Sequence, residues 1–173
     1  EESMHGIIGN KFNRFQEDEI VPLVDKLVAK NISRKEFEEF LVLRHSIERN
    51  ENVRKINAKS KKPRADLADG GAGSLNGQRL LDNYVKNEMQ SKYGMRWNDS
   101  TQSWEGGNRK ALALNDLSAD FDSITRGTLQ ELKNSGLINQ ESLDKLNSHY
   151  KYYAPLRGLS PDEDIAIEER ARL

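Results

Sequence analysis

The sequence predicts an all-α fold, an irregular domain of five to seven helices with a small hairpin or loop insertion near residues 95–106. Apolar residues recur at spacings of three and four through most of the chain. Residues typical of helix starts precede these stretches, and glycines typical of helix ends follow them. The segment GMRWNDSTQSWEGG also breaks the rhythm, where two tryptophans seven residues apart flank a polar turn, which predicts a short β-hairpin or a stapled loop.

The first half of the chain contains two long helical patterns. Residues 7–30 predict one helix or two, in which Pro22 either kinks the helix or begins its second half. The next helix is predicted over about 34–58. Ser33 followed by Glu36 forms a capping box at its start, and the pattern then continues without a breaker.

The second half alternates loops and helices. Residues 59–75 predict a loop, 76–93 a helix ended by Gly94, and 109–135 a helix ended by Gly136. Asn139 is expected to cap a helix that reaches about Tyr150, with Leu137 packing onto Leu143.

The last twenty residues of the chain predict an extended segment followed by a helix. Ala154 precedes proline and is expected to be extended. Ser160, Pro161 and Glu163 then form a helix start, which predicts a last helix over 161–172. We therefore expect one helical domain over 1–160 and a tail or helix over 161–173 that leads out of it.

Composition excludes several classes of function. The 27 basic and 28 acidic residues give a net charge of −1, which argues against a uniformly cationic nucleic-acid binder. The absence of cysteine excludes disulfides, a thiolate nucleophile and sulfur-ligated zinc. No apolar run is long enough to span a membrane, the three histidines lie far apart in sequence, and no cofactor motif or metal-ligand spacing is present.

The most informative segment is RHSIERN at 44–50, where polar residues continue an apolar helix stripe. Arg44 and Glu48 stand one turn apart, where opposite charges can pair. In one interpretation His45 and Glu48 are a general base and acid of a hydrolase or transferase, with Arg44 binding an anion. In the other, which we favour, these residues form a buried polar cluster that ties the helix to backbone groups or to the YYAPLRG segment.

The same residues carry a resemblance. The pattern resembles a helical module of the very large polyvalent proteins of tailed phages and related mobile elements, over about residues 20–160. The matching positions are Arg44, His45, Glu48, Arg49, Asn50, Gly71, Gly73, Tyr153, Pro155, Leu156, Arg157 and Gly158. The resemblance implies a spacer between enzymatic domains of a parent protein packaged in the virion and ejected with the DNA. The WNDSTQSW segment departs from that pattern.

A basic segment offers an alternative function. Between residues 54 and 64 the chain carries six positive charges and no acid, namely Arg54, Lys55, Lys59, Lys61, Lys62 and Arg64. Such a segment can bind the phosphates of DNA or RNA, together with Arg109 or Lys110. It is also typical of a solvated helix end, where cations favour the negative end of the helix dipole.

The sequence thus leads to a non-enzymatic structural or interaction module from a large phage or mobile-element protein. Its expected partners are other domains of the parent or other virion proteins, in the virion or in the host cytoplasm after ejection. A structural polar cluster is expected at Arg44, His45, Glu48, Arg49, Asn50, Tyr153 and Arg157.

Overall fold

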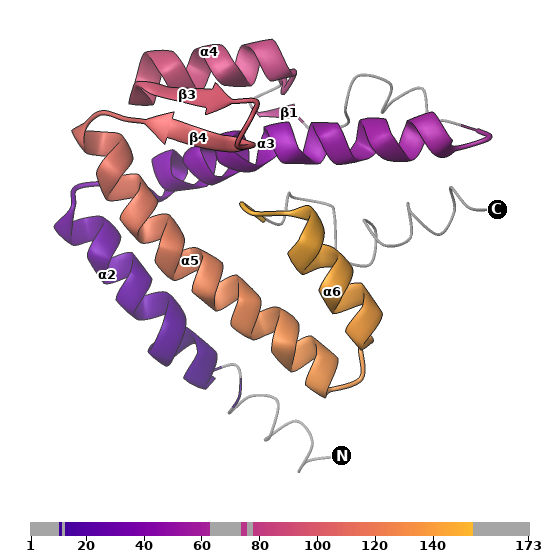
Figure 1. The fold of residues 1–173 in the computed structure, drawn as a ribbon. Coiled ribbons are helices and arrows are strands. Elements are labelled where there is room, and N and C mark those ends of the chain that lie inside the picture. The colour runs from indigo at the N-terminus through magenta and orange to yellow at the C-terminus, as the bar shows by residue number, and fades with distance from the viewer. Residues whose placement is uncertain (1–10, 12, 63–73, 76–77, 154–173) are drawn as a thin grey trace.

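A computed structural model describes residues 11, 13–62, 74–75 and 78–153. These residues form five α-helices, a short π-helical turn and two small antiparallel hairpins (Figure 1). The all-α prediction with a hairpin insertion is confirmed. The predicted helix at 161–172 and the positions Gly71, Gly73, Pro155, Leu156 and Gly158 lie outside the described residues.

Pro22 marks a change of helix type at the start of the chain. The π-helical turn η1 (Gln16–Ile20) leads directly into α2 (Val21–Ala29), and the Val21 N–H donates to the Gln16 carbonyl five residues back. Proline has no N–H, so the regular bond to the carbonyl four residues earlier is missing at Pro22. A single π turn is a common way to absorb such a gap in a continuous helix.

Helix α3 (Arg34–Lys59) is the central element, and its predicted boundaries are confirmed to within a residue. The Ser33 hydroxyl accepts from the Glu36 N–H at 3.2 Å, as the capping box predicts. The Glu36 carboxylate itself binds Lys110 of α5 at 2.5 Å. At about 1.5 Å per residue the helix is about 39 Å long. Helices α4 and α5 pack against it, while α2 lies along α5 (Figure 1).

Helix α4 (Asp82–Tyr93) begins six residues later than predicted. It is preceded by a small hairpin whose two strands, β1 (Ser74–Leu75) and β2 (Gln78–Arg79), have two residues each. The apolar residues Leu80 and Leu81 suggested helical periodicity, but Leu81 is extended and serves as the N-cap. Gly94 ends α4 in the left-handed conformation with φ of 66°, as expected for a helix-ending glycine.

The predicted insertion is a hairpin of β3 (Met95–Asn98) and β4 (Ser103–Gly106). Trp97 and Trp104 lie directly opposite each other, with ring centroids 5.2 Å apart in an edge-to-face arrangement. Trp104 is buried, and Trp97 is partly buried against the same core. The tryptophan pair thus fixes the register of the hairpin.

Helices α5 (Arg109–Asn134) and α6 (Gln140–His149) complete the fold. Asn108 and Asn139 cap them through side-chain oxygens. The expected packing of Leu137 onto Leu143 is wrong, because Leu137 is 71% exposed, while Ile138 next to the cap is buried in its place. A staple residue precedes the cap directly, so the prediction was displaced by one position.

The two glycines at 107 and 127 predict opposite responses to alanine. Gly107 has φ of 129°, and a Cβ atom there would lie 2.9 Å from the Ala111 Cβ atom, whereas Gly127 lies within α5 with no neighbour within 4 Å of its added Cβ. We expect Gly107→Ala to lower the free energy of unfolding by about 1–3 kcal/mol. Gly127→Ala should raise it by about 0.5–1 kcal/mol, since alanine favours the helix. Urea unfolding measures both, and equal effects would contradict this backbone geometry.

Candidate functional site

The polar turn, residues 44–50 of α3, is enclosed on all sides. Of its seven residues only Glu48 is not fully buried. A helix buried around its whole circumference cannot direct polar side chains to water. Each polar side chain here must therefore find a partner on a neighbouring element.

Arg44 reaches α5 rather than its helical neighbour. Its Nη2 atom lies 2.6 Å from Asp122 Oδ1 and its Nη1 atom 3.2 Å from Asp122 Oδ2, a bidentate pair in which both side chains are largely buried. The guanidinium also lies 5.1 Å from the centre of the Tyr152 ring. The pairing of Arg44 with Glu48 that the sequence allowed is thus replaced by a contact across 78 residues.

Glu48 holds the segment that follows α6. Its carboxylate accepts from the backbone N–H of Lys151 at 3.2 Å and of Tyr152 at 2.9 Å. Burial raises the pKa of Glu48, and these two hydrogen bonds oppose that shift without cancelling it. Glu48 therefore binds the backbone at Lys151 and Tyr152, where the YYAPLRG segment begins.

His45 is enclosed and held neutral. Its ring lies edge-on to Tyr150 and Tyr153, with centroids 5.0 and 5.8 Å away. Burial, followed by the positive charges of Arg49 and Arg44, lowers the pKa of His45 to about 3, while a hydrogen bond with the Tyr152 backbone acts in the opposite direction. The buried Nδ1 atom has no hydrogen-bond partner within the described part of the chain.

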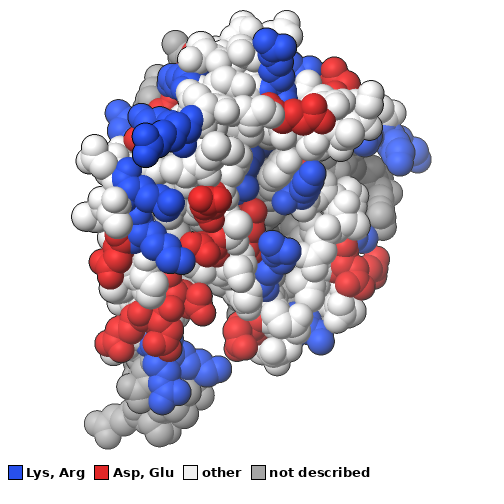
Figure 2. Space-filling model, turned by 60° about the vertical axis from the view of Figure 1, so that its left-hand side comes forward, with Lys and Arg blue, Asp and Glu red and all other residues white. Residues whose placement is uncertain are grey.

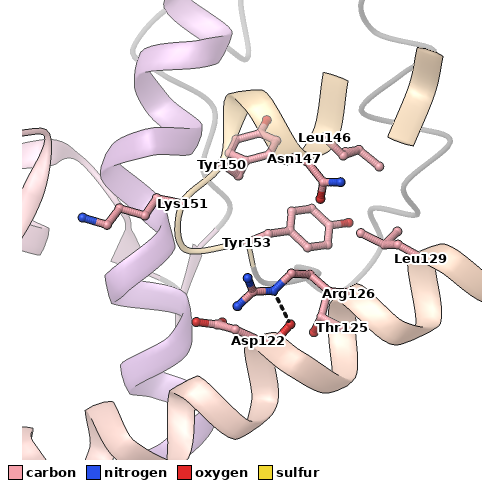
Figure 3. A pocket seen from close by; sticks show the side chains of 9 residues that line it. All are labelled: Asp122, Thr125, Arg126, Leu129, Leu146, Asn147, Tyr150, Lys151 and Tyr153. Carbon is pink, nitrogen blue, oxygen red and sulfur yellow. Dashed lines mark hydrogen bonds between the residues drawn. The ribbon is translucent and has the colours of Figure 1, made fainter. Parts of the chain in front are cut away.

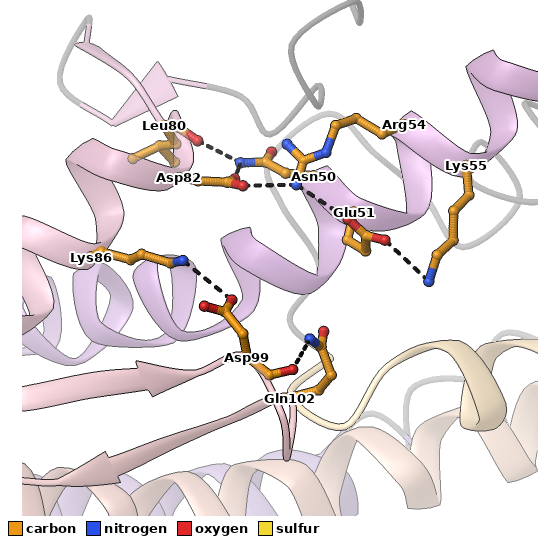
Figure 4. A network of polar contacts seen from close by, with 9 residues as sticks. All are labelled: Asn50, Glu51, Arg54, Lys55, Leu80, Asp82, Lys86, Asp99 and Gln102. Atoms are coloured by element: carbon orange, nitrogen blue, oxygen red, sulfur yellow. Dashed lines mark hydrogen bonds and ion pairs between the residues drawn. The ribbon is translucent and has the colours of Figure 1, made fainter.

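The opposite side of α3 is bound to the start of α4 (Figure 4). The Asn50 amide donates to the Leu80 carbonyl and to Asp82 Oδ1, both at 2.8 Å. Arg54 donates to the other oxygen of Asp82 at 2.7 Å. Because Asp82 lies in the first turn of α4, its negative charge also favours that helix end.

The sequence predicted only part of this arrangement. The structure brings Arg44, His45, Glu48 and Tyr153 into one region, buries Arg49 nearby and places Asn50 toward α4; Arg157 lies outside the described residues. Sequence reasoning missed the partners Asp82, Asp122 and Trp104, whose indole N–H donates to the Arg44 carbonyl at 3.0 Å. No local signal marks a partner 28 to 78 residues away.

The basic segment divides into two parts. Arg54 and Lys55 form ion pairs with Glu51, and Arg54 also binds Asp82. Lys59, Lys61 and Lys62 are exposed, and Arg64 lies outside the described residues. On the face shown in Figure 2 blue and red residues alternate, so neither sign of charge dominates it. Four of the six cations of the candidate nucleic-acid interface are therefore exposed at described positions, and one of these four, Lys55, is paired with Glu51.

His45 and Glu48 do not line the three described clefts, although the largest of these clefts is lined by their neighbours Tyr150, Lys151 and Tyr153. Neither residue is among those that line three clefts of about 460, 340 and 180 Å³ in the described structure. The largest lies between α5 and α6 (Figure 3). Within the described ranges, no three His, Asp or Glu side chains gather closely enough to hold a metal.

None of the described helices combines the length and the apolar character needed to cross a membrane.

The chain matches no family model, and neither a curated protein nor a solved structure is significantly similar to it.

The buried pair of Arg44 and Asp122 predicts a large loss of stability on truncation. Asp122→Ala would leave the Arg44 charge buried without its carboxylate, and we expect the free energy of unfolding to fall by about 3 kcal/mol. The matched control is Asp120→Ala, two residues away on α5, which breaks a solvent-exposed pair with Lys26. Such exposed pairs contribute about 0–1 kcal/mol. Similar losses in both variants, measured from urea midpoints, would refute the role of the buried pair.

Because His45 is neutral in the folded chain, we expect the free energy of unfolding to fall in acid. Its pKa is lowered from 6.5 to about 3 in the folded chain, so below pH 6.5 the unfolded chain binds the extra proton first. Stability from this group is complete above pH 6.5 and falls with pH down to about 3, by about 2 kcal/mol between pH 6.5 and 5. The His45→Gln variant lacks this titration, so its free energy of unfolding should not show this loss. We expect the difference in free energy of unfolding between wild type and His45→Gln to become smaller by about 2 kcal/mol from pH 6.5 to pH 5. Urea unfolding at each pH measures it. Parallel pH profiles would contradict a neutral, buried His45.

Proposed function

We propose that this chain is a non-catalytic helical module that holds together neighbouring parts of a larger phage or mobile-element protein. The observation that carries the proposal is the use of the polar turn. Arg44, Glu48 and Asn50 each bind a different neighbouring segment, so the residues that most resemble catalytic groups serve the fold.

The alternative of a hydrolase or transferase has less support from the site. A general base works best when its pKa lies near the working pH. A pKa of about 3 makes His45 a weak base at neutral pH, and the Glu48 carboxylate already accepts two backbone hydrogen bonds. Neither side chain lines the clefts described above.

An exposed apolar face on α2 supports a role in interaction. Val21, Val24 and Val28 follow one another at spacings of three and four residues, and they are 49%, 47% and 73% exposed. The opposite side of the same helix buries Leu23 and Leu27 in the core. Exposed apolar patches of this kind are typical of contacts with other proteins. We call these three residues the valine face.

The resemblance to polyvalent phage proteins supports the choice of partner and place. In that context the valine face would contact another domain of the parent protein or another virion protein. The parent would be packaged in the virion and enter the host cytoplasm during DNA ejection. A spacer of this kind needs a packed core and a contact surface, and the buried core and the valine face support this proposal.

The proposal predicts which variants retain function in the phage or element that encodes the chain. We expect Val24→Asp combined with Val28→Asp to keep the fold by circular dichroism, yet to reduce incorporation of the parent protein into particles at least tenfold. The matched control is Leu137→Asp at the turn between α5 and α6, which alters a single exposed leucine and should have no effect. Immunoblots of purified particles measure the incorporation.

A second variant separates the proposal from catalysis. His45→Gln, tested at a temperature where it remains folded, should support infection or transfer at the wild-type level. A general base contributes about 10²–10⁴-fold to a reaction, so a loss of that size in a folded His45→Gln protein would overturn the proposal.

A further inference from the structure

The exposed side of η1 and α2 carries acidic groups beside the valine face. Residues three or four apart are neighbours on a helix surface, so Asp25 borders both Val21 and Val28. Glu17 lies four residues before Val21, and both carboxylates are exposed. Neither carboxylate forms an ion pair with another described residue. We call Glu17 and Asp25 the acidic edge.

The lysines at the end of this helix face α5 instead. The Lys26 Nζ atom lies 2.8 Å from Asp120 Oδ2, and the Lys30 Nζ atom lies 3.9 Å from Asp116 Oδ2. Helix α2 is an outer helix of the fold, and α5 covers the side on which these pairs form (Figure 1). Because both lysines are paired there, the valine face has unpaired acids at its border and no unpaired lysine of α2.

These features define the chemistry of the partner. Valines at helical spacing form a stripe that the apolar stripe of another helix can cover. Glu17 and Asp25 are eight residues apart, which is about 12 Å along the axis at about 1.5 Å per residue. Two bases that are two turns apart at the border of the partner's stripe would therefore face both acids. Such charges set the register of the contact, while the buried apolar groups supply most of the attraction.

A second copy of the chain does not fit this description. Its own valine face brings the same acidic edge to the contact, because its lysines also pair with α5. In an antiparallel two-fold contact centred on the face, the two copies of Asp25 lie on the same side of the axis, where like charges repel. An anionic lipid surface is disfavoured for the same electrostatic reason.

We propose that the valine face binds a helix of another protein domain, and that lysine or arginine residues two turns apart border the apolar stripe of that helix. This inference rests on the proposed function, because it names the chemistry of the partner that the valine face contacts. The acidic edge gives the surface a selectivity among apolar helices that burial of valine alone does not provide.

Two synthetic helical peptides, added to the full chain, test this chemistry. They share one stripe of leucines and differ only at two positions, two turns apart on its border, which are lysine in one peptide and glutamate in the other. We expect the lysine peptide to bind about tenfold more tightly at low salt and to shift the methyl resonances of Val21, Val24 and Val28 most. Added salt should reduce the difference. Equal affinities, no binding of either peptide, or shifts centred elsewhere overturn the proposal.

Charge reversal separates the acidic edge from the net charge of the chain. Glu17→Lys combined with Asp25→Lys should reverse the preference, so that the glutamate peptide binds more tightly. The control, Glu131→Lys combined with Asp144→Lys, changes the net charge equally at exposed positions of α5 and α6 and should leave the preference unchanged. A preference that reverses in both variants overturns the proposal. Self-association of the chain in sedimentation that Val24→Asp abolishes also overturns it, because a second copy would then cover the face.

Incorporation of the parent protein into particles distinguishes this inference from the proposed function. Glu17→Lys combined with Asp25→Lys should reduce incorporation at least fivefold, and the control pair on α5 and α6 should not. Incorporation that depends on Val24 and Val28 but is unchanged by the loss of the acidic edge overturns this inference alone. Incorporation that depends on neither overturns the proposed function as well.

Discussion

The burial of the polar turn in α3 is the constraint on which the rest of the structure depends. A helix enclosed around its circumference must satisfy its polar side chains within the protein, and each direction offers a different neighbour. Arg44 points to α5, Asn50 to the start of α4 and Glu48 to the segment after α6. The Arg44 carbonyl also accepts a hydrogen bond from the indole N–H of Trp104 in the β3–β4 hairpin. Four separate parts of the chain are thereby positioned against two turns of one helix.

These contacts define position more than they add stability. An ion pair taken out of water costs desolvation energy that its attraction only partly returns, so Arg44 and Asp122 contribute chiefly by excluding other placements of α5. His45 avoids the cost of burying a charge, because burial and the positive charges of Arg49 and Arg44 keep its ring neutral. The apolar contacts of residues such as Phe40, Leu43 and Leu114 supply the main driving force.

One surface is available for interaction with a neighbour once the polar turn is assigned to the fold. The valine face is apolar and lies on a helix whose other side is committed to the core. A packed helical module with one apolar face for a neighbour fits a connecting role in a larger protein, as we propose.

The sequence by itself determined the local features of this protein. Ser33, Asn108 and Asn139 begin helices and Gly94 ends one because caps depend on atoms within three or four residues, and the paired tryptophans needed only a short turn. Tertiary structure decided the partners of Arg44 and Glu48, which lie 78 and up to 104 residues away. It also decided that α4 begins at Asp82, which is bound by Arg54 of α3, 28 residues away in the sequence. Hydrophobic spacing shows that a side chain is buried, but the identity of its neighbour follows only from how the helices pack.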